Sequence, residues 1–561
     1  MGLPPFLPFF IAAVVVALAP PRARSAVLLA TPLLGGLVLL GLEEGVYFGH
    51  AFLGFHVAPV RVDRLSLLFG YLFHIGAFIA IVYSLHLRDR VQHIAGLVYA
   101  GSALGAVFAG DFLTLFVFWE LMAVSSVFLI WARRTERAMA AGFRYLMIQV
   151  LSGFLLLAGA LLHFFQSGSL EFTYIGLEGP AAWLIFIAFG IKCAFPTLHN
   201  WLTDAYPQAT PTGTVFLAVF TTKVAVYCLA RGYPGTEMLV YIGVAMTIFP
   251  IFYAVIENDL RRVLAYSMIN QIGFMVVGIG IGTELALNGA VSHAFNDVIF
   301  KGLLMMSMGA VLHMTGRMNG SDLGGLYKSM PITTGLCIVG AASISAFPLF
   351  SGFVSKSMIM VAALEEGYTW VWLGLLFASA GVFHHAGIKI PYFAFFAHDA
   401  GIRTTEPPTN MLIAMGIAAV LCIGIGSYPW WLYALLPFDP GYNPFDSTHV
   451  IAQMQLLFFS ALAFAWLNIS GRYPPELPSV NLDAEWIYRR LLPRAIHRAG
   501  VAIIRIDRRV RQRVVGATLR LVDNVAARYG SPSQAASAWP TGRMVLVVVI
   551  MLGLYVLVTT S

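Results

Sequence analysis

The amino-acid sequence predicts an all-α polytopic membrane protein with about 14–16 transmembrane helices. Of its 561 residues, 59% are hydrophobic and only 11% are charged, and the mean hydropathy is +0.80. This is more apolar surface than a water-soluble core can bury. The apolar residues also gather in stretches of about 20, the length that a helix needs to cross a bilayer. Both observations favour a helical bundle in lipid.

The first apolar stretch is expected to remain in the protein as a helix. The chain begins MGLPPFLPFF, without the basic residues that open a cleavable signal. Its first arginines, Arg22 and Arg24, follow the apolar run instead. This order is not that of a cleavable secretory signal.

The net charge of +7 is concentrated in short loops and one late stretch. When the loops are numbered in order, the even ones carry only Arg61, Arg64 and Arg231. The odd ones carry Arg22, Arg24, Arg88, Arg90, Arg133, Arg134, Arg137, Arg261, Arg262, Arg317, Lys328 and Arg403. Because basic loops stay in the cytoplasm, we expect the odd loops to be cytoplasmic and the N-terminus to lie outside. Topology accounts for the charge, and no nucleic-acid partner is expected.

The chain divides into segments of different composition. We expect scaffold helices in 1–90, a first core half in 91–232, a second core half in 233–400, peripheral helices in 401–470, a basic amphipathic surface segment in 471–540 and a last transmembrane helix in 541–561. The scaffold includes a turn-rich passage over 42–63. In the surface segment, apolar residues recur at helical spacing among arginines. This predicts one amphipathic helix or two short ones at the membrane surface, and the alternative is a cytoplasmic linker.

Two spans of the core are predicted to be interrupted helices. Residues 190–196 and 346–356 each place a proline and a lysine inside an apolar stretch, and both contain the triplet Ala-Phe-Pro. Proline breaks the hydrogen-bond pattern of a helix, and in lipid the freed carbonyls must face protein or water. A matched pair of interrupted helices is typical of transporters built from repeats. The alternative is that the shared triplet arose by chance.

Ionisable residues interrupt the apolar core stretches, and they are the candidate site. They are Glu120, Lys192, Lys223, His293, Asp297, Lys301, Lys356 and Lys389. A charge at mid-bilayer costs about 2.5–3.5 kcal/mol on insertion scales, so it is rarely kept without a role. The alternative for any single residue is a structural ion pair or a lysine that reaches the interface.

Two arrangements among these residues predict proton transfer. Glu120 has no basic residue in its own stretch, so we expect a partner such as Lys192 on another helix. His293, Asp297 and Lys301 are spaced four residues apart and share one helical face over about 12 Å. Such a face suits a proton relay, and the alternative is a polar stripe that packs on a neighbour. A zinc site is disfavoured because the stripe has one histidine and a repelling lysine.

The cysteines predict no chemistry. Cys193, Cys228, Cys337 and Cys422 lie singly in apolar stretches without metal-ligand or redox spacing. We expect them to be packing residues. No disulfide, metal or cofactor is predicted.

Six strings resemble the signature segments of the proton-conducting membrane transporter family. They are FVFWELM, GIKCAFPTLHNWLTDAYPQATP, TTKVAVY, DLRRVLAYSMINQIGFM, SHAFNDVIFKGLL and FPLFSGFVSK, in the family's order over about 60–400. The chain is similar to the D-type subunit of Mrp-type Na+/H+ antiporters and to the antiporter-like subunits of respiratory complex I. The resemblance implies fourteen core helices and two inverted five-helix repeats containing broken helices, so that 91–232 and 233–400 become the first and second antiporter repeats.

The resemblance also implies roles for the same charged residues. It assigns the functional glutamate to Glu120, the broken-helix lysines to Lys192 and Lys356, and the central histidine to His293. Lys223 and Lys301 match its other lysines. Lys389 would lie on the thirteenth helix, where His384 and His385 would hydrate an exit path. The sequence departs from many relatives at Asp297, where they have a second histidine, and at Ser357, where an acidic residue is common.

The predicted function is ion translocation by one subunit of a multi-subunit membrane complex. It would be cation (Na+)/proton antiport or proton translocation along a mid-membrane chain of Glu, Lys and His residues. The alternatives are a proton-pumping subunit of a complex I or membrane-bound hydrogenase relative, and a secondary carrier for a small organic solute. No nucleophile triad or nucleotide loop indicates an enzyme. We expect a bacterial inner-membrane protein whose basic C-terminal helix is cytoplasmic, with membrane subunits, protons, monovalent cations and anionic lipid as partners.

Overall fold

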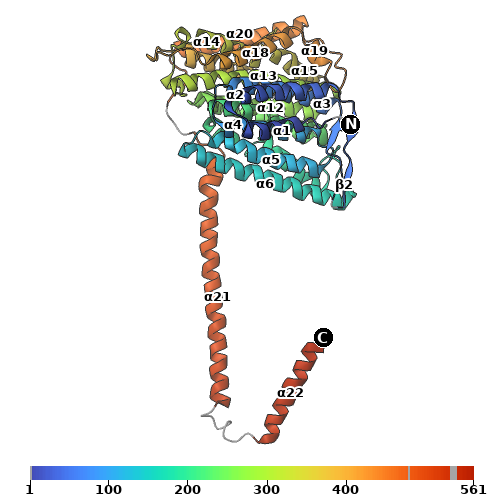
Figure 1. Ribbon diagram of the computed structural model, residues 1–561. Helices are drawn as coiled ribbons and strands as arrows, with labels where there is room; N and C mark the ends of the chain where they lie inside the picture. The colour runs from blue at the N-terminus through green and yellow to red at the C-terminus, as the bar shows by residue number, and fades with distance from the viewer. Residues whose placement is uncertain (1–2, 53, 478–480, 531–539, 561) are drawn as a thin grey trace. The chain divides into compact units, whose positions relative to one another are not determined.

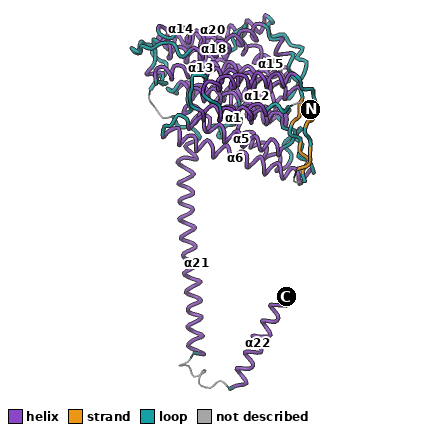
Figure 2. The backbone as a smooth tube through the Cα atoms, viewed as in Figure 1, coloured by secondary structure: helices purple, strands orange, loops and turns teal. Residues whose placement is uncertain are grey.

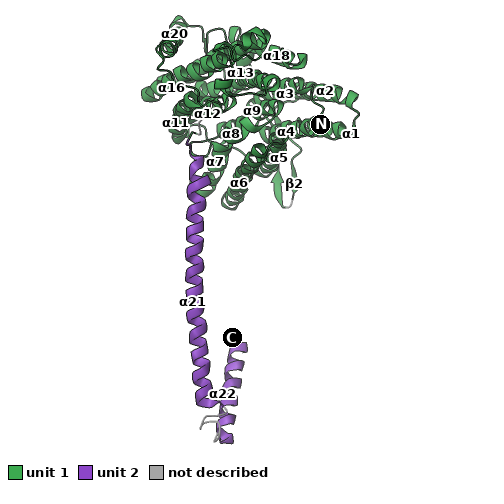
Figure 3. Ribbon diagram, turned by 90° about the vertical axis from the view of Figure 1, so that its left-hand side faces the viewer, with its two compact units in different colours: residues 1–481 green, residues 482–561 purple. Residues whose placement is uncertain are grey.

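The computed structural model describes residues 3–52, 54–477, 481–530 and 540–560 (Figure 1). The predicted segments 1–90, 471–540 and 541–561 therefore each include some residues outside the described part of the chain. The chain forms two compact units, Met1–Asn481 and Leu482–Ser561, which are coloured separately in Figure 3. The first unit is a helical bundle and contains every candidate site residue.

The first half of the bundle is built from apolar helices that begin at capping residues. Asp63, Asp89 and Asp111 each accept a backbone amide hydrogen bond at the start of α3, α4 and α5, as N-caps do. The helices are α1 (Leu7–Leu18), α2 (Pro21–Leu40), α3 (Arg64–Ser84), α4 (Arg90–Phe108), α5 (Phe112–Trp131), α6 (Glu136–Ser167), α7 (Gly179–Lys192), α8 (Asn200–Ala205), α9 (Pro211–Val219) and α10 (Thr221–Gly232).

The second half continues the bundle and contains a series of short turns around α17. Its helices are α11 (Glu237–Ile256), α12 (Leu260–Ile281), α13 (Glu284–Thr315), α14 (Pro331–Ile344), α15 (Ser351–Glu365), α16 (Thr369–Val382), α17 (Lys389–Pro391), α18 (Thr409–Ser427), α19 (Trp430–Tyr433) and α20 (Ser447–Ile469). Two π-helical turns, Phe383–Ile388 and Tyr392–Phe396, flank α17. The helix that carries Lys389 is therefore irregular.

The turn-rich passage after α2 forms two small antiparallel ribbons, which the sequence did not predict. β1 (Gly45–Tyr47) pairs with β4 (Val60–Val62), and β2 (His50–Phe52) pairs with β3 (Phe55–Val57). Figure 2 shows these strands together at one end of the bundle. The pairing satisfies backbone groups that a loop would leave to solvent.

The ends of the helices form two faces, held by contacts between loops. On the first, which we call the strand face, Gly110 N donates to Ala58 O at 2.9 Å and Gly235 N donates to Ile279 O at 2.9 Å. On the other, which we call the loop face, Gly320 N donates to Asn258 O at 2.8 Å. The odd-numbered, arginine-rich loops lie on the loop face.

Two helices are interrupted at matching points, as the sequence predicted. α7 ends at Lys192 and α14 ends at Ile344, and each is followed by the triplet Ala-Phe-Pro. Ala194 and Ala346 have positive φ values of 63° and 56°. Because a left-handed conformation is rare for residues other than glycine, the match shows that the shared triplet carries a shared backbone geometry.

The membrane character of the fold is confirmed by helix length and composition. Among the described residues, 13 helices are long and apolar enough to cross a membrane, counting α9 with α10 and α16 with its π-helical extension. Three shorter apolar helices are α1, α7 and α14. The protein is therefore an all-α polytopic membrane protein.

Within the described residues, the second unit contains the π-helical turn Ile487–Leu491 and two α-helices. α21 (Leu492–Tyr529) is one continuous helix of 38 residues, which decides between the one-helix and two-helix predictions. Arg511 pairs with Asp507 at 2.9 Å and Arg489 pairs with Glu485 at 2.9 Å, both at helical spacing. α22 (Thr541–Thr560) is the apolar helix predicted at the end of the chain.

Candidate ion-translocation site

Glu120 lies on α5, and its carboxyl group packs against Gly153 of α6, which has no side chain to fill that space. A Cβ atom added to Gly153 would overlap with Oε1 of Glu120, so a larger residue there would displace the carboxyl group. Oε1 is buried and has no hydrogen-bond partner. The residue as a whole is half-buried. Glu120 is thus a carboxyl group near the lateral surface of the bundle, with one oxygen turned inward.

Lys192 is the last residue of α7 and reaches back to α5. Its Nζ donates to the Trp119 carbonyl at 2.6 Å and lies 4.2 Å from the centre of the Trp119 ring. Trp119 is held in turn, because its Nε1 donates to Ser152 Oγ at 3.0 Å. Lys192 therefore contacts the carbonyl of Trp119, the residue before Glu120, and its charge also attracts the Glu120 carboxyl group through space.

Lys223 and Asp297 form the central ion pair of the site. Lys223 Nζ lies 2.6 Å from Asp297 Oδ2, and both side chains are 0% exposed. The pair joins α10 to α13. Lys223 Nζ also donates to Ala218 O of α9 at 3.1 Å, a carbonyl next to the interruption between α9 and α10. A pair this deeply buried is costly to desolvate, which favours a functional over a purely stabilising role.

His293 precedes Asp297 by one turn of α13 and is held in one tautomer. Its Nδ1 is 2.9 Å from Ser355 Oγ, and its Nε2 is 3.2 Å from Gln271 Oε1. Because the amide oxygen of Gln271 can only accept, Nε2 donates to it and Nδ1 accepts from Ser355. Gln271 is oriented by its own bond to Asn270 Oδ1 at 2.8 Å.

Lys301 follows Asp297 by one turn on the same face. Its Nζ donates to Ser267 Oγ of α12 at 2.8 Å, and the side chain is fully buried. The three members of the predicted stripe thus contact α10, α12 and α15. This confirms that His293, Asp297 and Lys301 face the interior of the bundle.

Lys356 lies on α15 beside the second interruption. Its Nζ donates to Ile344 O, the last carbonyl of α14, at 3.2 Å, and lies 4.9 Å from the centre of the Phe274 ring. The side chain also lines a cavity of about 200 Å³ with Ser357, His449 and Gln453. Lys356 therefore combines a helix-end carbonyl with a partly polar cavity.

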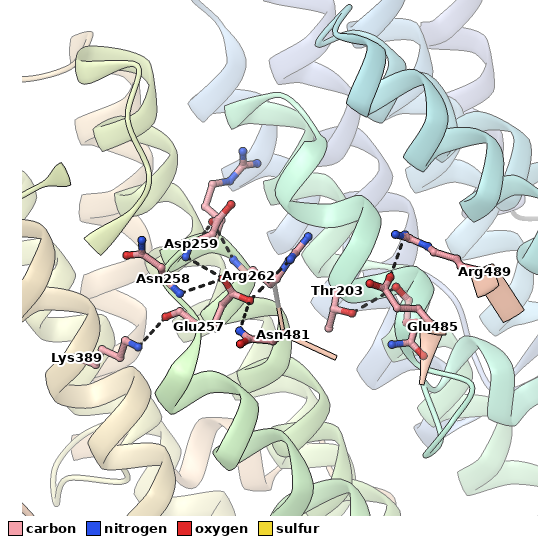
Figure 4. Close-up of polar contacts among 11 residues, drawn as sticks. Thr203, Glu257, Asn258, Asp259, Arg262, Lys389, Asn481, Glu485 and Arg489 are labelled. Carbon is pink, nitrogen blue, oxygen red and sulfur yellow. Dashed lines mark hydrogen bonds and ion pairs between the residues drawn. The ribbon is translucent and has the colours of Figure 1, made fainter. Parts of the chain in front are cut away.

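Lys389 lies at the loop face, away from the other lysines. Its Nζ donates to the carbonyls of Ala254, Val255 and Glu257 at the end of α11 at 3.2, 2.7 and 2.7 Å, and pairs with Glu476 Oε1 at 2.8 Å. Figure 4 shows Lys389 pointing at the end of this helix. Burial raises the pKa of Glu476, although the charge of Lys389 opposes the shift.

Glu257 extends this loop-face group. Its carboxylate accepts from Asn481 Nδ2 at 3.2 Å and lies 3.8 Å from Arg262 Nη1 (Figure 4). Asn258 N and Asp259 N also donate to it, at 3.0 and 3.1 Å. The carboxylate thereby orders the turn between α11 and α12.

The eight predicted residues fall into three groups. The structure brings His293, Asp297, Lys301, Lys223 and Lys356 together around α13 and its neighbours. Glu120 and Lys192 form a second group around Trp119. Lys389 belongs to the third, at the loop face, where His384 contacts the rings of Phe464 and Tyr473.

Several site residues were missed by the sequence predictions. Ser267, Asn270 and Gln271 are polar residues in the apolar stretch of α12, and that stripe could have indicated a contact with α13. Glu476 follows the last span of the bundle, where an acidic residue has no pattern of its own. Only the tertiary fold buries it against Lys389.

The described residues offer amines, carboxyl groups and an imidazole in a row but no metal site. No group of three or more His, Cys, Asp or Glu side chains within the described part of the chain is arranged to hold a metal ion. The four cysteines are free and buried. Neighbouring acids and bases in a low-dielectric interior can pass protons along hydrogen bonds. The arrangement is suited to proton transfer through the middle of the bundle.

The fold and the site together define a polytopic helical membrane protein with interrupted helices and a buried row of titratable groups. Residues 109–384 match the family model described as NADH:quinone oxidoreductase/Mrp antiporter, transmembrane. This part of the chain is similar to that family. It contains all of the predicted site residues except Lys389.

The chain is also similar to individual subunits of antiporters and respiratory complexes. The chain is 29% identical over 422 residues to the A subunit of the Na(+)/H(+) antiporter of Alkalihalophilus pseudofirmus, covering 66% of this chain and 52% of that protein. It is 32% identical over 322 residues to the N subunit of the NADH-quinone oxidoreductase of Desulforudis audaxviator, covering 53% and 64%. The chain thus spans between half and two thirds of these relatives. A chain of the membrane-bound sulfane sulfur reductase, an archaeal respiratory membrane complex, has the same fold, with a TM-score of 0.71, 22% identity and coverage of 98% and 99%.

Proposed function

We propose that the chain is the ion-translocating subunit of a multi-subunit membrane complex and exchanges a cation such as Na+ for protons. The observation that carries this proposal is the Lys223–Asp297 pair at 2.6 Å and 0% exposure, flanked on α13 by His293 and Lys301. These groups provide alternating proton donors and acceptors at mid-membrane depth. The chain acts as a transporter component, and any redox chemistry would belong to its partners.

The names of its relatives support assignment to a subunit of an ion-translocating complex. One relative is part of a Na(+)/H(+) antiporter, and another is part of an NADH-quinone oxidoreductase. The second candidate function is therefore proton pumping in a redox-driven complex. Both functions use the same row of residues and differ in the partner subunits.

A carrier for an organic solute is less well supported. Such a protein needs a binding cavity of about 300–1,000 Å³ among its helices. The cavity that touches the site residue Lys356 is about 200 Å³. Buried lysines with hydrogen-bond partners occupy the bundle centre instead.

The faces of the bundle support an orientation. Arginine-rich odd loops, with Arg133 and Arg261 both bonded to Pro207 O, lie on the loop face. We assign that face to the cytoplasm by the positive-inside rule, which leaves the strand face and the N-terminus outside. The setting is a bacterial inner membrane.

α21 is assigned to the cytoplasmic membrane surface. Its arginines would contact anionic lipid or a partner protein, each at about 1 kcal/mol near the surface. A cysteine at Arg513, probed with an impermeant thiol reagent in intact cells, should stay unlabelled and become labelled after the cells are opened. Labelling in intact cells would reverse the orientation.

The central test of function is Lys223→Ala in the complete complex. Membrane vesicles should lose cation-dependent proton movement, measured with a fluorescent pH probe, while the abundance of the chain is unchanged. Lys328→Ala is the matched control, because Lys328 is exposed and pairs with Asp399 at 3.5 Å on the loop face. Normal exchange by Lys223→Ala would exclude the proposed path. Co-purification under mild detergent separates the two candidate complexes, because redox subunits indicate the second one.

A further inference from the structure

α10 carries a line of polar groups from the central ion pair to the strand face. Lys223, Tyr227 and Arg231 are spaced four residues apart on this helix. They therefore share one helical face over about 12 Å. Lys223 is a member of the central pair, whereas Arg231 stands one residue before the end of the helix. Tyr227 lies between them and is fully buried.

Arg231 closes the strand-face end of this line. Its Nε donates to the Tyr227 hydroxyl at 2.8 Å. Its Nη2 donates to Asp63 Oδ1 at 2.8 Å, and its Nη1 lies 2.8 Å from Asp63 Oδ2. The guanidinium thus binds the carboxylate with two nitrogens, the strongest form of this contact. The Arg231 side chain is 11% exposed and that of Asp63 is 32% exposed, so the pair stands at the edge of solvent.

Asp63 is held in place independently of Arg231. It caps α3 by accepting from Ser66 N at 2.9 Å, and its own N–H donates to Ser66 Oγ at 2.9 Å. Arg61 Nε lies 3.6 Å from its Oδ2, and Arg61 also approaches Glu171 at 3.9 Å. The carboxylate is therefore a fixed anchor for the long side chain of Arg231.

The ionisation of Asp63 keeps the contact closed at neutral pH. Burial acts to raise the pKa of Asp63, but the hydrogen bond and charge of Arg231, the Ser66 amide and Arg61 together lower it. A carboxyl group with a lowered pKa is charged at all pH values above its ordinary range and loses the interaction only in stronger acid. Opening at neutral pH therefore requires movement of Arg231, because Asp63 remains ionised.

We propose that Tyr227, Arg231 and Asp63 form a gate between the Lys223–Asp297 pair and the strand face. In the closed state the Tyr227 oxygen accepts from Arg231, and the fixed guanidinium charge repels cations. When Arg231 moves away, that oxygen can accept a proton that water has carried from Lys223, and the hydroxyl proton passes to water at the strand face. The phenol is unchanged by the transfer, and Lys223 is left neutral. The inference rests on the proposed function, because it needs Lys223 to exchange protons.

The test compares proton leak in vesicles that contain the complete complex. Asp63→Asn retains an oxygen that can cap α3 but removes the charge that holds Arg231. Losing a charge-assisted hydrogen bond favours the open gate by about tenfold. We expect an imposed pH gradient, followed with a fluorescent probe and no exchangeable cation, to decay about tenfold faster than in the wild type.

The matched control is Asp111→Asn on the same face. Asp111 caps α5 and accepts from Ala58 N at 2.8 Å, as a structural aspartate that holds a loop. Its variant should leave the leak at the wild-type rate. A wild-type leak in Asp63→Asn at normal abundance would overturn the gate, and so would an equal leak in both variants.

Tyr227→Phe provides a second test of the gate, for the case in which the Asp63→Asn variant does not assemble. The phenyl ring retains the contact with Phe69, whose ring centre is 5.4 Å away, but has no oxygen for the relay. We expect proton exchange to slow about 100-fold, the lower end of the range for the loss of one proton-transfer group, at unchanged abundance. An unchanged rate would overturn the relay role. If Lys223→Ala also leaves transport unchanged, the proposed function has failed; if it stops transport, only the gate has failed.

Discussion

The two interrupted helices have the same backbone but place their lysines differently. Ala194 N donates to Ile191 O at 3.1 Å, and Ala346 N donates to Ser343 O at 3.1 Å. Phe195 N and Phe347 N each reach back five residues, both at 3.0 Å. Lys192 is the last residue before the first interruption, whereas Ile344 occupies that position in the second.

The second lysine lies on the other side of its interruption and reaches back across it. Lys356 lies on α15, and its Nζ contacts the carbonyl of Ile344 at 3.2 Å. The Lys356 amine therefore lies at the C-terminal end of α14, where the helix dipole favours a positive charge, whereas the amine of Lys192, the last residue of α7, turns to the Trp119 carbonyl of α5. Each interruption therefore has a buried lysine beside it, but the two lysines occupy different sequence positions relative to the interruption.

The largest expected effect is the loss of either of these lysines or of Glu120. Lys192→Ala, Lys356→Ala and Glu120→Ala should each reduce cation-dependent proton movement in vesicles by at least about 100-fold, because one group in the row is missing and its neighbour is left buried without it. Assembly should be unchanged on native gels. Activity in Lys356→Ala but not in Lys192→Ala would show that the two interruptions are not equivalent in function.

A double variant tests whether transport requires an amine at the end of α14 rather than a lysine at residue 356. Lys356→Ala combined with Ile344→Lys returns an amine to the end of α14, at the position that Lys192 has in α7. We expect this double variant to recover about tenfold over Lys356→Ala, since it regains the favourable site for a positive charge. Transport rates of the three forms, normalised to abundance, give the answer. A double variant as inactive as the single one would mean that Lys356 must lie on α15.

A smaller effect is expected at Asp297, which lies in the second half of the core and pairs with Lys223 of the first half. Asp297→Asn removes the charge that faces Lys223 at 2.6 Å but keeps a side chain of the same shape. Transport should slow by about 100-fold, the lower end of the range for a proton-transfer group, and its pH optimum should shift. The pH profile of exchange is the measurement. A slower rate with an unchanged profile would favour a structural role for Asp297.

The smallest effect concerns the backbone of the interruptions. Ala194→Gly and Ala346→Gly relieve a left-handed conformation that costs about 1–2 kcal/mol for residues other than glycine, offset by about 1 kcal/mol of added chain entropy. Both variants should therefore shift the thermal midpoint in detergent by little, and by the same amount. Ala188→Gly, inside α7, is the control and should destabilise. Opposite shifts in the first two would contradict the shared geometry.

Much of this architecture follows from the sequence. Apolar stretches of membrane length and the Ala-Phe-Pro triplets predicted the bundle and both interruptions, because lipid leaves a chain few ways to satisfy its backbone. The spacing of His293, Asp297 and Lys301 predicted their common face, because helical periodicity is a local property. Lys223, Tyr227 and Arg231 on α10 have the same spacing, but their proposed role as a gate depends on Asp63, which is distant in sequence.

Only the tertiary structure decided which charges meet. It paired Lys223 with Asp297 and Lys389 with Glu476, linked Lys192 to Glu120 through Trp119, and placed Lys356 beside Ile344. A sequence determines which groups are forced into the membrane, since that follows from local hydropathy. Which partner relieves the cost of each buried charge is determined by helices that are far apart in the chain and adjacent in the fold.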